Sequence, residues 1–166
     1  MTRARILVMD DDPLFRSLLA ATLRKDYLVS VAADGAEGFA KAVEHVPDLA
    51  VVDLQMPVRD GLAVLKMFRA HPALRSVPVV MLTGDNSKSS VVTAIQHGVN
   101  DYIIKTSFNK LEFLQKISQQ LQTKQQSQVA SAEVPQQLED HRQAEAVPVA
   151  AAPSEQQLQS ILDNWE

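Results

Sequence analysis

Two short apolar runs in this chain each end in acidic residues. Residues 6–9 are followed by Asp10 and Asp11, and residues 49–52 are followed by Asp53. Short apolar runs of this kind are typical of buried parallel strands, whose carboxyl ends form the ligand-binding edge of open α/β sheets. We therefore expect the three carboxylates to lie close together. Because clustered carboxylates repel one another, they need a cation or a shared proton, and Mg²⁺ suits oxygen ligands of this type.

The elements that must position these acids alternate between strand and helix patterns. The expected strands are residues 6–9, 27–33, 48–52, 77–82 and 101–104. The expected helices are residues 13–24, 36–45, 61–70, 87–97 and 108–122. We expect Leu14, Leu18 and Leu19 to face inward in the first helix, and Gly98 to end the fourth. The alternation predicts an α/β fold, a five-stranded parallel sheet with helices on both faces.

The composition changes after residue 122, so we expect a domain over residues 1–122 and a separate tail. Residues 123–153 are rich in Gln, Ala and Ser and contain three prolines, which predicts a disordered linker. In residues 154–166, Ser154 and Gln157 fit a helix-capping box. A single apolar stripe follows at helical spacing and is a candidate partner-binding surface, formed by Leu158, Ile161, Leu162 and Trp165.

The bulk composition narrows the class of protein. Hydrophobic residues make up 46% of the 166 residues, enough for a buried core, and cysteine is absent, which excludes disulfides and thiolate chemistry. The basic start is followed by too short an apolar run for a signal peptide, and no run approaches the roughly 20 residues of a membrane span. We therefore expect a cytoplasmic protein without membrane insertion.

Charge is distributed unevenly along the chain. Residues 1–122 carry 14 Lys and Arg against 13 Asp and Glu, whereas residues 123–166 carry 2 against 7. Nucleic-acid-binding arms are basic, because they must neutralise phosphates. The acidic tail therefore argues against direct contact with nucleic acid.

Four segments, in order and at matching spacings, carry a resemblance to a known family. They are ILVMDDDP at 6–13, VVDLQMP at 51–57 with DGL at 60–62, VVMLTG at 79–84, and DYIIK at 101–105. Through them, residues 3–122 resemble the receiver domain of two-component response regulators. The resemblance implies the doubly wound, flavodoxin-like sheet with strand order 2-1-3-4-5.

The resemblance also implies roles for individual residues. Asp53 would be the phosphoacceptor, receiving a phosphoryl group from a sensor histidine kinase or a phosphotransfer protein. Mg²⁺ would be held by Asp10, Asp11, Asp53 and the backbone carbonyl of Gln55. Asp12 suits a helix N-cap instead, just before the first helix.

Three further residues would respond to the phosphoryl group, namely Thr83, Tyr102 and Lys105. The chain departs from the family pattern at Thr106, where the family usually has a proline after a cis bond. A cis bond before a residue other than proline costs about 2.5–4 kcal/mol. The geometry of the Lys105–Thr106 peptide, and with it the reach of Lys105, stays open at this point.

The expected output is contact with a downstream protein that the sequence does not name. A DNA-binding or catalytic domain needs at least about 50 residues, and 44 follow residue 122. One candidate surface is the 87–122 face, which is also a candidate dimer interface on phosphorylation. The other is the stripe that ends in Trp165, although that segment could equally pack on its own domain or belong to a truncated linker.

Two other functions remain open. A receiver-like scaffold that works without phosphorylation is favoured by Thr106 and opposed by the acidic residues. A magnesium-dependent phosphatase would need a general acid two residues after its nucleophile, but Gln55 has that spacing from Asp53. Taking Asp10 as the nucleophile places Asp12 at that spacing but leaves Asp53 less well explained.

Overall fold

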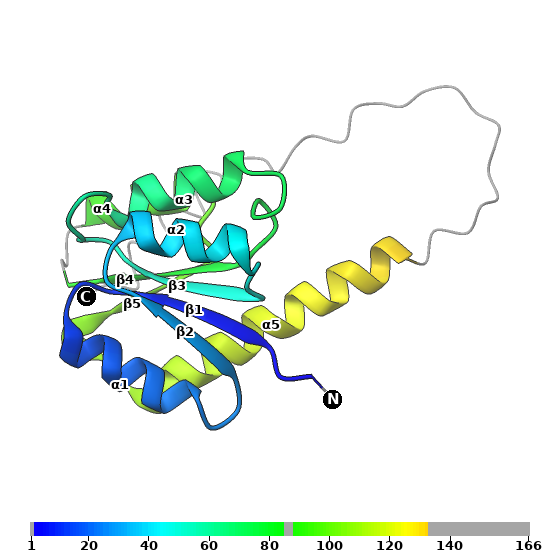
Figure 1. The fold of residues 1–166 in the computed structure, drawn as a ribbon, viewed down its shortest axis with the longest axis horizontal. Coiled ribbons are helices and arrows are strands. Elements are labelled where there is room, and N and C mark those ends of the chain that lie inside the picture. The colour runs from blue at the N-terminus through cyan, green and yellow to red at the C-terminus, as the bar shows by residue number, and fades with distance from the viewer. Residues whose placement is uncertain (1, 85–87, 133–166) are drawn as a thin grey trace.

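The computed structural model describes residues 2–84 and 88–132, and it consists of a parallel sheet between two layers of helices (Figure 1). The strands are β1 (Arg5–Met9), β2 (Leu28–Ala32), β3 (Leu49–Asp53), β4 (Val79–Thr83) and β5 (Asp101–Ile104). All neighbouring strands are parallel, and their order is β2-β1-β3-β4-β5. The predicted fold class and strand order are therefore confirmed.

The helices cover both faces of this sheet. They are α1 (Pro13–Leu23), α2 (Gly35–Glu44), α3 (Gly61–Ala70), α4 (Lys88–Gln96) and α5 (Lys110–Ala132), with a short 3₁₀ turn, η1 (Lys105–Ser107), before α5. Figure 1 shows α2 and α3 on one side of the sheet and α1 and α5 on the other. The central strands are consequently buried on both faces, which is why they read as continuous apolar runs.

Aspartates fix the start of the first three helices. Asp12 accepts hydrogen bonds from the backbone N–H groups of Leu14 and Phe15, at 2.9 and 3.3 Å. Asp34 and Asp60 cap α2 and α3 in the same way. A side-chain acceptor of this kind satisfies backbone donors that have no partner within the helix. The expected N-cap role of Asp12 is therefore confirmed.

The sheet separates two apolar clusters. Leu7 and Met9 of β1 pack with the α2 and α3 side, and Ile6 and Val8 pack with α1 and α5. Because successive side chains of a strand point to opposite faces, one apolar run supplies both clusters. Gly98 follows α4 with a positive φ of 86°, which confirms it as the end of that helix.

The predicted inward face of α1 is partly wrong. Leu19 is fully buried, but Leu14 is 82% exposed and Leu18 is 47% exposed. The buried side of the helix instead runs through Leu19 and Leu23, and Phe15 packs against the same cluster. Residues 15, 19 and 23 share one helical face, and residues 14 and 18 lie about 100° away on the next.

The last helix begins and ends later than predicted. It starts at Lys110 and continues to Ala132, so residues 123–132 are helical and not linker. This stretch contains no glycine or proline, and Lys124 anchors it by an ion pair to Asp48 at 3.6 Å. Residues 133–166, including the predicted apolar stripe, and residues 85–87 lie outside the described residues.

Within residues 2–84 and 88–132, none of the helices combines the length and the apolar character needed to cross a lipid bilayer.

Candidate functional site

Strand register brings the predicted acids together at one edge of the sheet. Met9 of β1 is paired with Val52 of β3, so the next residues, Asp10 and Asp53, emerge side by side. Carboxylate oxygens of Asp10, Asp11 and Asp53 lie within 4.8 Å of one another. Asp10 and Asp53 are buried, whereas Asp11 is exposed to solvent. The cluster is therefore a partly enclosed acidic pocket with one solvent-facing carboxylate.

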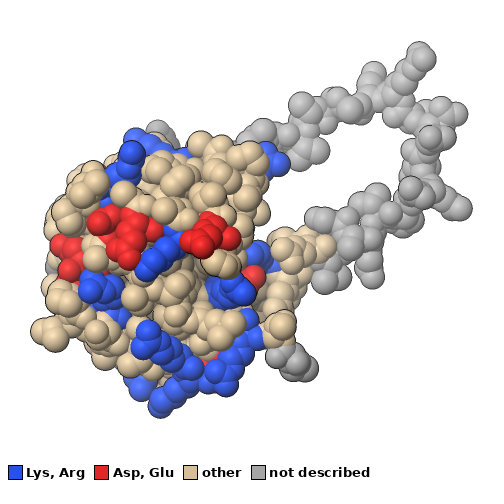
Figure 2. All heavy atoms as spheres, in the orientation of Figure 1, with Lys and Arg blue, Asp and Glu red and all other residues tan. Residues whose placement is uncertain are grey.

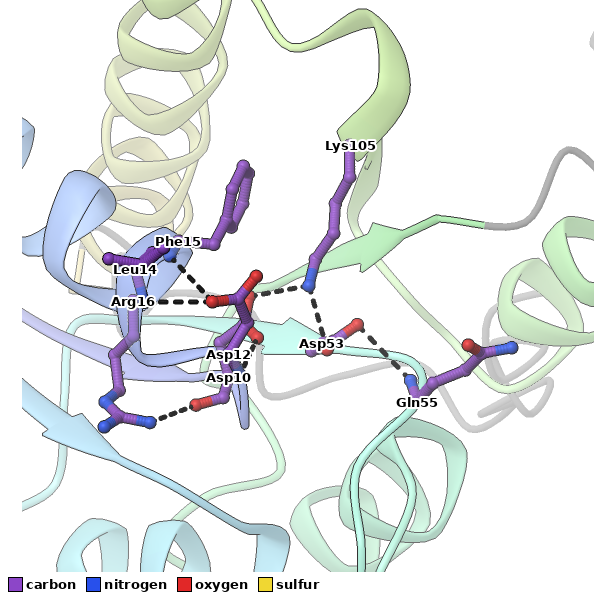
Figure 3. Close-up of polar contacts among 8 residues, drawn as sticks. All are labelled: Asp10, Asp12, Leu14, Phe15, Arg16, Asp53, Gln55 and Lys105. Atoms are coloured by element: carbon purple, nitrogen blue, oxygen red, sulfur yellow. Dashed lines mark hydrogen bonds and ion pairs between the residues drawn. The ribbon is translucent and has the colours of Figure 1, made fainter.

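Lys105, the first residue of η1 directly after β5, completes the charged cluster. Its ammonium nitrogen lies 2.8 Å from Asp10 Oδ2 and donates a hydrogen bond to Asp53 Oδ2 at 3.0 Å (Figure 3). The Lys105–Thr106 peptide is trans, and η1 begins at Lys105. A trans peptide before Thr106 thus still lets Lys105 reach both buried acids, which answers the question that the sequence left open.

Burial and charge perturb the protonation of this cluster. Burial raises the pKa of Asp53 to about 6, with the hydrogen bond from Lys105 opposing the rise and the charge of Asp10 adding to it. For Lys105, burial alone would lower the pKa, but hydrogen bonds that the ammonium group donates to both carboxylates, together with their negative charges, outweigh burial and raise the pKa. The ammonium group therefore stays charged, while the Asp53 carboxylate is held in an unfavourable ionised state at neutral pH.

Backbone groups orient the acids. Asp10 Oδ1 accepts a hydrogen bond from the Asp12 N–H at 2.9 Å, and Asp53 Oδ1 accepts one from the Gln55 N–H at 3.3 Å. Asp10 Oδ2 is buried and accepts no backbone hydrogen bond within the described part of the chain, and the Lys105 ammonium group lies 2.8 Å from it. A buried carboxylate oxygen that no backbone N–H group binds can serve as a ligand atom for a cation.

The acidic pocket fits a divalent cation. Three carboxylates and one ammonium group leave an excess of negative charge, and carboxylate oxygens are the ligands that Mg²⁺ prefers. Beside the pocket is an open hollow of about 610 Å³, and Asp11 and Gln55 are among the residues that line it. Figure 2 shows acidic and basic side chains interspersed on the viewed face, so the excess of negative charge described here is local to the pocket.

The other two residues predicted to respond to the phosphoryl group, Thr83 and Tyr102, lie on β4 and β5. Thr83 is the last residue of β4 and is 2% exposed, and it directly follows Leu82, the register partner of Asp53. Tyr102 lies on β5, where its ring packs against the apolar cluster on the α2 and α3 side. The Lys116 ammonium group lies 5.4 Å from the centroid of the Tyr102 ring. Their roles as switch residues stay predictions.

Two residues beside the pocket were missed by reasoning from the sequence. Arg16 Nη1 donates a hydrogen bond to the backbone carbonyl of Asp10 at 2.7 Å, and the Phe15 ring faces the Lys105 ammonium group. Both belong to the first turn of α1, directly after the acidic segment (Figure 3). Their closeness in sequence to Asp10 was the available signal, but the orientation of the helix decides which side chains turn toward the pocket.

Comparison with known proteins identifies the family. Residues 6–118 match the response regulator receiver domain. Among curated proteins, the DNA-binding response regulator MtrA of Mycolicibacterium smegmatis is 36% identical over 104 residues, covering 62% of this chain and 44% of the relative. Response regulator PleD of Caulobacter vibrioides is 35% identical over 103 residues, covering 61% and 23%. The chain thus spans less than half the length of these relatives.

Solved structures of similar proteins agree with this assignment. The chemotaxis response regulator CheY4 of Vibrio cholerae has a TM-score of 0.67 and 30% identity, covering 72% of this chain and 99% of that chain. The receiver domain of sensor histidine kinase PA1611 from Pseudomonas aeruginosa has a TM-score of 0.67 and 28% identity, covering 72% and 98%, and it holds a magnesium ion in its active-site cleft. The chain belongs to the response regulator receiver family, and a receiver domain is a signalling phosphoacceptor and not in itself a conventional enzyme.

Proposed function

We propose that Asp53 accepts a phosphoryl group from a histidine kinase or a phosphotransfer protein in a magnesium-dependent reaction. One observation carries this proposal: Asp10, Asp11, Asp53 and Lys105 converge at the carboxyl edge of the sheet, where Asp53 belongs to the candidate cation site and also pairs with the Lys105 ammonium group. Carboxylates can act as nucleophiles that form aspartyl phosphates. The relatives support the same role, since receiver domains take part in phosphoryl transfer.

In the proposed reaction, a carboxylate oxygen of Asp53 attacks the phosphorus atom of a phosphohistidine. A P–O bond to Asp53 forms, the P–N bond to the imidazole breaks, and the released imidazole nitrogen keeps the bonding electron pair and takes up a proton. The three carboxylates and the Gln55 carbonyl would hold Mg²⁺, which when bound would neutralise charge on the phosphoryl oxygens. Lys105 places a second positive charge next to the group being transferred.

We propose that Lys105 and Thr83 change their contacts when Asp53 is phosphorylated. Lys105 now pairs with Asp10 and Asp53, and a phosphoryl group on Asp53 would offer it a new anionic partner. Thr83 follows the register partner of Asp53 and carries a hydroxyl group able to donate to a phosphoryl oxygen. These new contacts would alter the face formed by α4, β5 and α5, where Tyr102 lies. The altered face would then bind a protein partner or a second copy of the chain.

The test is intact-mass measurement after incubation with acetyl phosphate, with and without Mg²⁺. We expect one added phosphoryl group that requires Mg²⁺, is removed by hydroxylamine and is absent in Asp53→Asn. Asp26→Asn, which replaces an exposed aspartate outside the pocket, is the matched control and should behave as the unaltered chain does. An adduct that persists in Asp53→Asn would refute the assignment of the phosphoacceptor. No adduct with two different phosphodonors would favour the phosphorylation-independent scaffold.

A further inference from the structure

The Lys105 ammonium group contacts an aromatic ring as well as the two buried acids. Lys105 Nζ lies 4.9 Å from the centroid of the Phe15 ring. An ammonium group within about 6 Å of a ring centroid is attracted by the negative face of the ring. In Figure 3, Phe15 and Lys105 approach the acidic residues from the same side but from different elements, α1 and the end of β5. The lysine is therefore bounded by two carboxylates and one ring.

The Phe15 ring is held in place by a second ring from the segment that follows Lys105. The ring centroids of Phe15 and Phe108 lie 5.3 Å apart, with an interplanar angle of 77°, which is an edge-to-face contact. Phe108 in turn lies 5.5 Å from Phe113, a fully buried residue of α5. Edge-to-face pairs at such distances are favourable. These rings connect the lysine-bearing turn η1, the start of α1 and the core beneath α5.

When no metal ion is bound, Lys105 pairs with carboxylates that also belong to the candidate metal site. Lys105 Nζ pairs with Asp10 and Asp53, which supply two of the three acids in that site. A divalent cation at the pocket would neutralise these acids and weaken their attraction for the ammonium group. The Phe15 ring carries no formal charge, so its attraction for Lys105 does not depend on the charge state of the acids.

We propose that Phe15 is a positioning residue, which keeps the Lys105 ammonium group beside Asp53 when a cation occupies the acidic pocket. This inference rests on the proposed function of Asp53 and adds a residue to it. Phe15 acts through Lys105 and does not touch the reacting atoms. The contribution of Phe15 to the phosphorylation rate should therefore depend on the negative charge at the face of its ring. A side chain of similar size without that negative face should not replace it.

The test compares full-length variants at position 15 for the rate of phosphorylation by acetyl phosphate at saturating Mg²⁺. Phe15→Tyr keeps the ring face and should react within twofold of the unaltered chain. Phe15→Leu, and pentafluorophenylalanine at the same position, remove or reverse the ring charge distribution and should slow the reaction about fivefold. The Mg²⁺ concentration for half-maximal rate should change less than twofold in all three. A Phe15→Leu protein that reacts at the unaltered rate would overturn the inference.

An NMR measurement tests the contact itself without any phosphoryl transfer. Protons on the carbon next to Lys105 Nζ should show an upfield ring-current shift in the Mg²⁺-loaded protein, with Lys105→Arg used for assignment. Phe15→Leu should abolish the shift, and Phe15→Tyr should retain it. If the chemical shift of these Lys105 protons is unchanged in Phe15→Leu, this inference is refuted and the proposed function is not affected. Failure of the unaltered protein to accept a phosphoryl group, with the shift present, would refute the proposed function alone.

Discussion

Replacing Asp53 with asparagine should stabilise the cation-free protein at neutral pH. Asp53 is buried beside Asp10, and burial raises its pKa from 3.8 to about 6 even though Lys105 donates a hydrogen bond to it. A raised carboxyl pKa means that folding favours the neutral form of the group and disfavours the ionised form. Asparagine has almost the same shape as the neutral carboxyl group and cannot ionise.

The magnitude follows from the pKa difference. The interval between 3.8 and about 6 corresponds to about 3 kcal/mol, because one pKa unit equals about 1.36 kcal/mol. Below pH 3.8 the carboxyl group is neutral in both the folded and the unfolded states, so the full stability is present. Stability is lost as the pH rises from about 4 to 6, and the loss is constant above pH 6. At pH 7.5 the free energy of unfolding of Asp53→Asn should therefore be about 3 kcal/mol higher than that of the unaltered chain.

The assay is urea denaturation of the full chain in EDTA at several pH values between 4 and 8, followed by far-UV circular dichroism. The difference between Asp53→Asn and the unaltered chain should be near zero at pH 4 and largest above pH 6. Asp26→Asn, at an exposed position, should differ by less than about 0.5 kcal/mol throughout. Added Mg²⁺ should narrow the gap at pH 7.5, because it stabilises the chain that keeps all three carboxylates.

Two results would refute this reasoning. One is an Asp53→Asn protein that is less stable than the unaltered chain at pH 7.5 without Mg²⁺. The other is a stability gap that does not change between pH 4 and pH 8. The first result would mean that the Lys105 ion pair outweighs burial and repulsion in setting the free energy of the pocket. The second would mean that these effects cancel and leave the pKa of Asp53 unshifted.

Four further substitutions test the fold by urea denaturation. Val58 is 80% exposed with a positive φ of 70°, so Val58→Gly should relieve strain and raise the free energy of unfolding by about 1 kcal/mol. A Cβ on Gly61 would lie 2.4 Å from the backbone oxygen of Asp53, so Gly61→Ala should lower the free energy of unfolding by at least about 2 kcal/mol. Gly38→Ala should lower it less, because the nearest atoms to the added Cβ belong to the flexible side chain of Met9. The Arg69 guanidinium donates to three backbone carbonyls, and Arg69→Met should lower stability by about 2–4 kcal/mol by leaving them unpaired.

Much of the fold could be predicted because its signals are local. Strands buried on both faces need continuous apolar runs, and an aspartate before a helix can satisfy the first backbone N–H groups of that helix. Asp12 illustrates this, since its cap bonds reach only residues 14 and 15. The strand order was implied by the family resemblance and is confirmed. Local patterns did not define the end of α5, whose last turns are anchored in part by a contact between Lys124 and Asp48.

The sequence by itself determined which acids the chain delivers to the carboxyl edge of the sheet, because strand ends and acidic residues are adjacent in the chain. Only the tertiary structure decided which side of α1 is buried, exposing Leu14 and turning Phe15 inward. It also decided that Lys105 reaches Asp53 from a trans peptide, 52 residues away in sequence. These outcomes depend on how separate elements pack in space, and helix rotation and loop reach are set by contacts that no contiguous stretch of sequence contains.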